Sequence, residues 1–142
     1  RYRSSAASDV YKRQGLGNVG LSLDLWNWMV GDGGLDQIDE LTAAKVVAVR
    51  LSDVPDGSDL ASLSSKDRLL PGTAEGTLAI KLVEWLETNN YEGPVSATPH
   101  SSQFSALTRD AVVQRTSEAL DAVLERSGAV EAAPVAAAAT EE

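Results

Sequence analysis

Three segments rich in strand-forming residues alternate along the chain with three segments of helical periodicity, and this order constrains the fold more than any other feature. The strand-like segments are residues 20–28, 45–51 and 94–98, and the helix-like segments are residues 35–44, 75–90 and 108–126. Strands that alternate with helices indicate βαβ units and a parallel sheet. Three units are too few for a complete open sheet covered on both faces, and they correspond to about three-eighths of a (β/α)₈ barrel.

The segments differ in how strongly their sequences predict them. Residues 45–51 (KVVAVRL) form a nearly continuous apolar run, which is typical of a parallel strand buried on both faces. For the helix at 108–126, Thr108 is a suitable N-cap, Asp110 lies in the first turn and Gly128 follows the end. Residues 52–72 form a long polar connection that contains two prolines and two glycines. Connections of this length in compact domains usually carry function.

The first fourteen residues, RYRSSAASDVYKRQ, have neither helical nor strand periodicity. Reverse translation of SSAASDVYKRQ gives a string that resembles a read-one adapter of transposase-based sequencing libraries. We therefore expect residues 1–14 to be an artefact and residues 15–128 to form the domain. Residues 129–142, rich in Ala and Glu, are expected to be a disordered tail. The chain would then be the C-terminal part of a longer protein.

Composition excludes several classes of function. The chain has 142 residues, enough for one domain, and a net charge of −9, which argues against nucleic-acid or anionic-membrane binding. It has no cysteine, which excludes disulfides and thiolate chemistry, and one histidine, His100. No apolar run approaches the roughly 20 residues that span a bilayer. By default, we expect a cytoplasmic protein.

Candidate functional residues lie at the carboxyl ends of the predicted strands, where barrel active sites are built. Asp24 is an ionisable group in an otherwise apolar segment, and alternation along a strand would place Trp26 on the same face. A parallel arrangement also puts Arg50 and Thr98 on this inward face. A buried carboxylate needs a partner, so Asp24 is expected to bind a metal or to pair with Arg50. For Arg50, an ion pair with Asp24 and a role in anion binding both remain open.

Four stretches together resemble the last three βα units of the xylose isomerase-like TIM barrel family, the sugar phosphate isomerases and epimerases. They are residues 20–28 (GLSLDLWNW), 45–53 (KVVAVRLSD), 66–72 (KDRLLPG) and 90–98 (NYEGPVSAT). The expected fold class is therefore α/β: the C-terminal part, about three βα units, of a (β/α)₈ TIM barrel truncated at its N-terminus.

The resemblance implies a divalent metal, Mn²⁺, Mg²⁺ or Zn²⁺, held by a Glu from an earlier strand, an Asp, a His and a Glu. The family's Asp falls on Asp24, and its sugar- or phosphate-binding Arg falls on Arg68. The chain departs from the family where Arg50 and Asn27 replace histidines and Thr98 replaces the last-strand Glu. We therefore expect a degenerate metal site in which Asp24 is the one matching ligand.

The expected function is that of a sugar phosphate isomerase/epimerase-like protein acting on a small sugar or polyol. The alternatives are a non-catalytic relative that binds a sugar or an anion, and a metal-dependent DNA-repair endonuclease with the same barrel. The expected partner is a small sugar or sugar phosphate, with no nucleic acid and no membrane. For two of the candidate residues a purely structural role is the alternative: Trp26 as a packing residue and His100 as a hydrogen-bonded surface group. The candidate substrate-binding residues are Asn27, Arg50, Arg68, Thr98, Trp26 and His100.

Overall fold

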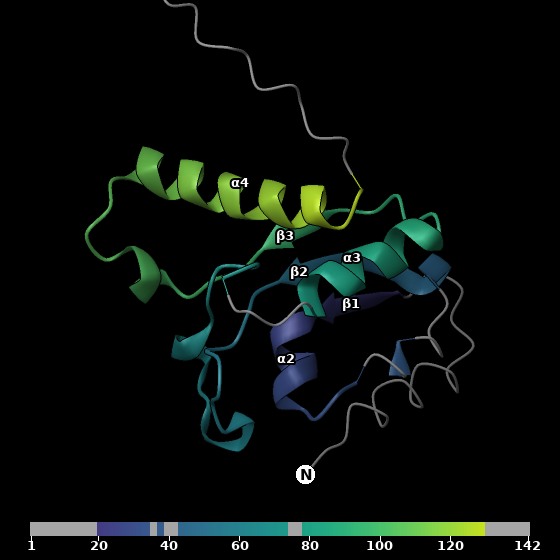
Figure 1. Ribbon diagram of the computed structural model, residues 1–142, viewed down its shortest axis with the longest axis horizontal. Coiled ribbons are helices and arrows are strands. Elements are labelled where there is room, and N and C mark those ends of the chain that lie inside the picture. The colour runs from purple at the N-terminus through teal and green to yellow at the C-terminus, as the bar shows by residue number, and fades with distance from the viewer. Residues whose placement is uncertain (1–19, 35–36, 39–42, 74–77, 130–142) are drawn as a thin grey trace, which may run out of the picture.

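The structure is a computed structural model that describes residues 20–34, 37–38, 43–73 and 78–129. Three strands alternate with helices along the chain (Figure 1). Short 3₁₀ helices interrupt the connections at Ala43–Lys45, Leu60–Ser62, Ser65–Asp67 and Ser101–Phe104. The main elements are β1 (Leu21–Asp24), α2 (Leu25–Val30), β2 (Val46–Leu51), α3 (Leu78–Thr88), β3 (Val95–Ala97) and α4 (Arg109–Arg126).

The three strands form one parallel sheet in the order β1-β2-β3. Leu23, Val49 and Val95 are register partners across the sheet, and so are Asp24, Arg50 and Ser96. A parallel sheet whose neighbours are joined through helices is the arrangement that the alternating sequence segments predict. The α/β class expected from the sequence is therefore confirmed.

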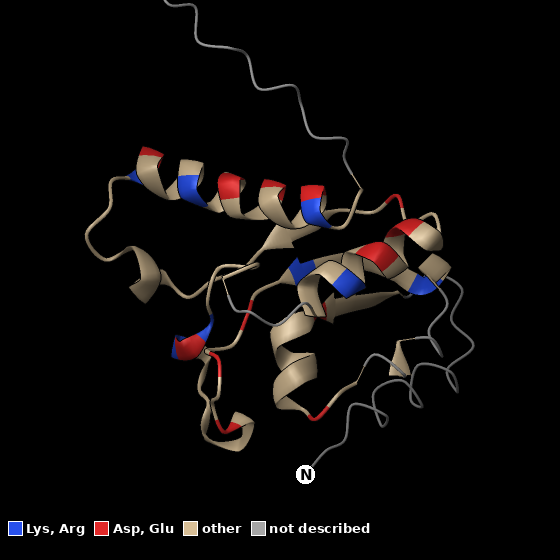
Figure 2. Cartoon of the chain, in the orientation of Figure 1, with Lys and Arg blue, Asp and Glu red and all other residues tan. Residues whose placement is uncertain are grey.

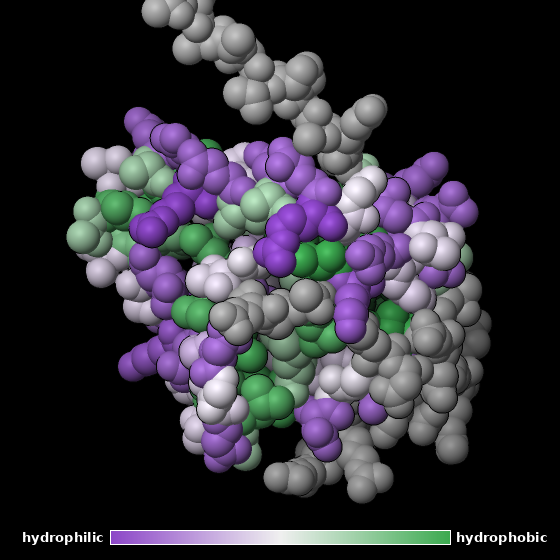
Figure 3. Space-filling view, viewed as in Figure 1, coloured by the Kyte–Doolittle hydropathy of each residue, from purple (hydrophilic) through white to green (hydrophobic). Residues whose placement is uncertain are grey.

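The hydrophobic core lies between one face of this sheet and the helices. Figure 1 shows α3 in front of β1 and β2, and α4 alongside β3. The core is made of buried aliphatic side chains from the strands and the helices together. Each helix contributes one apolar stripe, and α4 buries only Val123 completely. Hydrophilic side chains gather along α4 (Figure 3), and acidic and basic residues both occur on it (Figure 2). The buried residues of the sheet and α3 are Leu23, Val46, Val49, Leu51, Ala79, Ile80, Leu82, Val83 and Leu86.

The opposite face of the sheet is polar and open among the described residues. Ser22, Arg50 and Ser96 are exposed, whereas their neighbours along the strands, Leu23 and Val49, are buried. Successive side chains of a strand point to opposite faces, so this pattern divides the sheet into a covered and an open side. The register places Asp24, Arg50 and Ser96 in one row on the open side, which agrees with the predicted common face of Asp24 and Arg50.

The first predicted strand is too long. The strand ends at Asp24, and residues 25–30 form the short helix α2 instead of extending the strand to residue 28. The cause is Asp24, which has an extended backbone and accepts a hydrogen bond from the Asn27 backbone N–H as an N-cap. Trp26 consequently lies in a helix, and strand alternation does not place its side chain.

The later elements agree more closely with the sequence. The helix predicted at 75–90 is found at Leu78–Thr88, with residues 75–77 outside the described part. The helix predicted from residue 108 begins at Arg109, and the Thr108 hydroxyl accepts from the Ala111 N–H as its N-cap. Most of the helix predicted at 35–44 lies outside the described residues, as do residues 1–14 and 130–142. Ala129, expected to begin the tail, packs against the core.

Candidate functional site

The candidate residues come together at the carboxyl-terminal edge of the parallel sheet. Asp24 ends β1, Ser52 and Asp53 follow β2, and Thr98 follows β3. Because all three strands are parallel, these positions lie at the same edge. In (β/α)₈ barrels this is the edge that carries the functional side chains.

Asp24 is held by two partners, one for each carboxylate oxygen. Its Oδ1 accepts from the Asn27 backbone N–H at 3.0 Å, and its Oδ2 accepts from Arg68 Nη1 at 3.0 Å. The side chains of Arg68 and Asp24 are 17% and 11% exposed, so the ion pair is largely shielded from water. The Asp24 carboxylate thus has an ion-pair partner, as its burial requires, but this partner is Arg68 and not the predicted Arg50.

The Arg68 guanidinium also lies over the indole ring of Trp26, 4.8 Å from its centroid. This geometry permits a cation–π interaction between the two side chains. Trp26 is buried, and its Nε1–H finds no hydrogen-bond partner in the described part of the chain. Trp26 is therefore first a packing residue, which agrees with its structural interpretation from the sequence, and Arg68 lies over its indole ring.

Backbone hydrogen bonds hold the segment that carries Arg68. Leu69 and Asp53 form an antiparallel bridge, with N–H to O distances of 2.9 and 3.2 Å, and the Arg68 carbonyl accepts from the His100 N–H at 3.1 Å. Pro71 is buried, and Gly72 packs against Val123 of α4. These contacts join the long polar connection after β2 to the sheet edge and to α4.

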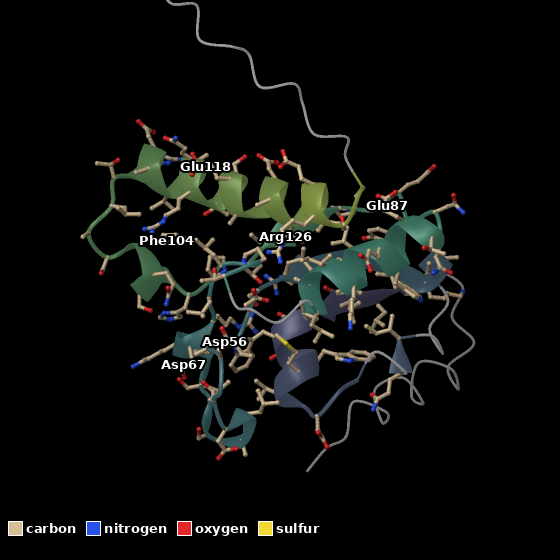
Figure 4. All side chains as sticks on the ribbon, viewed as in Figure 1. Asp56, Asp67, Glu87, Phe104, Glu118 and Arg126 are labelled. Carbon is tan, nitrogen blue, oxygen red and sulfur yellow. The ribbon has the colours of Figure 1, made fainter. Side chains whose placement is uncertain are left out.

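The turn just before Arg68 is closed by Asp67, which Figure 4 labels on this connection. The Asp67 carboxylate accepts from the Ser64 backbone N–H at 2.8 Å and from the Ser64 hydroxyl at 2.9 Å. These hydrogen bonds, with smaller contributions from His100 and Lys66, lower the pKa of Asp67 below its ordinary value.

Thr98 and His100 make local hydrogen bonds. The Thr98 N–H donates to the Leu51 carbonyl at 2.8 Å, and its hydroxyl lies 3.5 Å from the same oxygen. His100 caps the 3₁₀ helix at Ser101–Phe104, because its Nδ1 accepts from the Ser102 N–H at 3.1 Å. His100 thus fits the hydrogen-bonded structural reading and positions the Arg68 backbone through its own N–H.

Arg50 and Ser52 complete the edge. Arg50 is exposed on the open face of the sheet, and within the described residues no ion pair forms for it. Ser52 is fully buried, and its hydroxyl has no hydrogen-bond partner in the described part of the chain. Sequence reasoning did not single out the Ser52 hydroxyl as a site residue. Ser52 lies two residues after Arg50, just beyond the end of β2, so the alternation that placed Arg50 on the inward face was the available signal.

The residues at this edge do not fit a divalent metal. Zinc and magnesium sites need several carboxylate, imidazole or thiolate ligands. Among the described residues no group of three or more such side chains could hold an ion. Both oxygens of Asp24 are already engaged, and a guanidinium lies where a cation would approach. The metal that the family resemblance implies is therefore not supported by this part of the chain.

Comparisons with protein-family models and with curated protein sequences find no match. Solved structures do match. A xylose isomerase domain protein from Alicyclobacillus acidocaldarius is 22% identical, with a TM-score of 0.72, and the match covers 87% of this chain and 43% of that one. The IolI protein, solved with a bound zinc atom, is 20% identical with a TM-score of 0.77, covering 87% and 44%.

A third similar structure is a xylose isomerase domain-containing protein from Salmonella typhimurium, 18% identical, with a TM-score of 0.70 and coverage of 84% and 44%. This chain spans less than half the length of these three proteins. No helix in the described ranges combines the length and the apolar character needed to cross a membrane. The described residues therefore have the fold of a xylose isomerase-like TIM barrel, of which they form about three βα units.

Proposed function

We propose that this chain is part of a sugar isomerase/epimerase-like protein that binds a small sugar, polyol or sugar phosphate at the carboxyl-terminal edge of its sheet. The observation that carries the proposal is the cluster of Asp24, Arg68 and Trp26 at that edge. The similar solved structures include xylose isomerase domain proteins, which supports the same substrate class.

The chemistry of the cluster suits a polyhydroxylated ligand. A carboxylate accepts hydrogen bonds from sugar hydroxyls, and a guanidinium donates them in a fixed planar fork. Because Asp24 and Arg68 already orient one another, a ligand that bridges them needs no further ordering of either side chain. Asn27 is exposed beside Asp24 and offers an amide that can both donate and accept.

A second candidate function is sugar binding without catalysis. Isomerisation by proton transfer between neighbouring carbons requires a base that can take the proton and return it. Within the described residues, the two carboxylate oxygens of Asp24 accept hydrogen bonds from Asn27 and Arg68. No group of three or more His, Cys, Asp or Glu side chains in that part of the chain could hold a metal ion. These observations favour a binding role for this part of the barrel.

Isothermal titration calorimetry of the 142-residue chain with xylose and ribose 5-phosphate tests the binding proposal. Binding should weaken in Arg68→Gln and should persist in Arg109→Gln, which removes an exposed arginine at the start of α4. A folded chain that binds neither compound would overturn the proposal. Detection of the converted sugar by NMR after incubation separates the two candidates, because an isomerase or epimerase forms a different sugar and a binding protein returns its ligand unchanged.

A further inference from the structure

The chain contains the dipeptide Asp-Gly twice, at Asp32-Gly33 and at Asp56-Gly57. Asp-Gly is prone to a backbone rearrangement in which the nitrogen of the second residue attacks the side-chain carbon of the aspartate. Glycine permits this attack because it has no Cβ to hinder the approach. Both aspartates are exposed, so access to water does not distinguish the two sites. The hydrogen bonds of the two glycine nitrogens do distinguish them.

The Gly33 nitrogen is held in the turn that ends α2. Its N–H donates to the Trp28 carbonyl at 2.9 Å, and the Asp32 N–H donates to the Met29 carbonyl at 3.0 Å. A Cβ at Gly33 would overlap the Trp28 ring, so this turn packs closely against that side chain. For the Gly33 nitrogen to reach the side chain of Asp32, its hydrogen bond to Trp28 would have to break.

Gly57 lies in an exposed turn of the connection that follows β2, next to Asp56, which Figure 4 labels. The Ser58 N–H closes this turn at 3.3 Å from the Pro55 carbonyl, and no backbone carbonyl of the described residues accepts from the Gly57 N–H. The φ of Gly57 is +68°, and a Cβ there would meet nothing within 4 Å. The Gly57 nitrogen can therefore move toward the Asp56 side chain without breaking a backbone hydrogen bond or a packed contact.

We propose that Asp56 is a site of spontaneous modification to isoaspartate, and that its turn protects Asp32 from the same reaction. The Gly57 nitrogen bonds to Cγ of Asp56 and loses its proton, while the side-chain carboxyl group loses its hydroxyl, so one water molecule leaves. The five-membered succinimide then takes up one water molecule. Opening at the main-chain carbonyl gives isoaspartate, and opening at Cγ restores aspartate, so the mass of the chain is unchanged in either case.

The rearrangement at Asp56 is independent of the proposed sugar binding. Isoaspartate lengthens the main chain by one methylene group within an exposed connection. Asp53, three residues earlier, forms the antiparallel bridge with Leu69 that closes this connection beside Arg68. The added length should therefore stay within the loop, and the ion pair of Arg68 with Asp24 should persist.

Incubation of the folded chain in water enriched in ¹⁸O, at mildly acidic pH, tests the proposal. Each passage through the succinimide introduces one oxygen atom from the solvent, so peptide mass spectrometry after digestion in ordinary water measures the reaction at each site. Residue 56 should take up about threefold to tenfold more label than residue 32, the factor that one protein hydrogen bond contributes. Asp56→Glu, which cannot close a five-membered ring, should abolish the label at residue 56. A carboxyl methyltransferase specific for isoaspartate should methylate the aged wild-type peptide.

The unfolded chain is the matched control, because unfolding removes the hydrogen bond of Gly33 and leaves both dipeptides intact. In guanidinium chloride the two sites should take up label at similar rates. Equal label at the two residues of the folded chain, more label at residue 32, or no label at either residue would overturn the proposal. An excess at residue 56 that persists in the unfolded chain would also overturn it, because the neighbouring sequence and not the structure would then set the difference.

Discussion

Arg68 Nη1 donates to Asp24 Oδ2 at 3.0 Å, although the two residues are 44 positions apart in the sequence. The pair joins the end of β1 and the start of α2 to the long connection between β2 and α3. Asp24 therefore serves both as the N-cap of α2 and as the counterion of Arg68. The local fold and the candidate site depend on the same carboxylate.

Replacing Asp24 should separate these two roles. Asp24→Ala removes both the N-cap and the ion pair, and we expect it to lower the free energy of unfolding by about 1–3 kcal/mol. Asp24→Asn keeps a good N-cap and loses only the charge, so it should cost less. Urea denaturation of both variants measures the difference, and equal losses would show that the cap contributes nothing.

Gly72 should tolerate a side chain poorly. Its φ of +76° lies in the left-handed region, and a Cβ there would come within 2.9 Å of Val123 Cγ2 in the core. We expect Gly72→Ala to lower the unfolding free energy by about 2–4 kcal/mol, from backbone strain and overpacking together. Thermal or urea denaturation checks this value.

Gly57 provides the matched control for Gly72. Its φ is +68°, but a Cβ there would meet nothing within 4 Å. Gly57→Ala should therefore cost only the strain, about 1–2 kcal/mol. If the two alanine variants are equally stable, the connection after β2 does not pack on α4 as described.

Asp67 should make the turn before Arg68 sensitive to acid. Hydrogen bonds from Ser64 lower the pKa of Asp67 in the folded chain. A depressed carboxyl pKa contributes stability at pH values above the unfolded pKa, and this contribution is lost as the pH falls through the folded pKa. Carboxyl NMR titration should find Asp67 below its ordinary value of 3.8, and Ser64→Ala should raise it. The rise should be partial, because alanine keeps the backbone N–H that contributes most and removes only the hydroxyl. An Asp67 pKa at or above its ordinary value in the wild-type chain would contradict the proposed cause.

The sequence predicts the regular elements where their periodicity is long. Residues 45–51 and 108–126 carry clear strand and helix patterns, and the structure places β2 and α4 within them. The prediction fails at residues 25–28, where a short apolar run fits either a strand or a helix. The side chain of Asp24 decides the outcome, because its hydrogen bond to the Asn27 N–H begins a helix.

The candidate site is predicted in part. Asp24 and Arg50 share a row because strand register follows from the alternating pattern. The pairing of Asp24 with Arg68 does not follow from that pattern, because Arg68 reaches the site from a long connection whose path depends on tertiary contacts. Sequence spacing therefore favoured Arg50 as the partner, and the fold brings Arg68 closer.

Chemical-shift mapping of the folded, ¹⁵N-labelled chain during titration with ribose 5-phosphate tests the proposed sugar site most directly. The proposal predicts that the largest shifts cluster at the carboxyl-terminal edge of the sheet, at Asn27, Arg50, Arg68 and Thr98. Residues at the opposite edge, such as Val46 and Val95, should change little. If the chain is saturated with ligand and no shifts appear at this edge, or if the shifts are confined to α4, the proposed sugar site is contradicted.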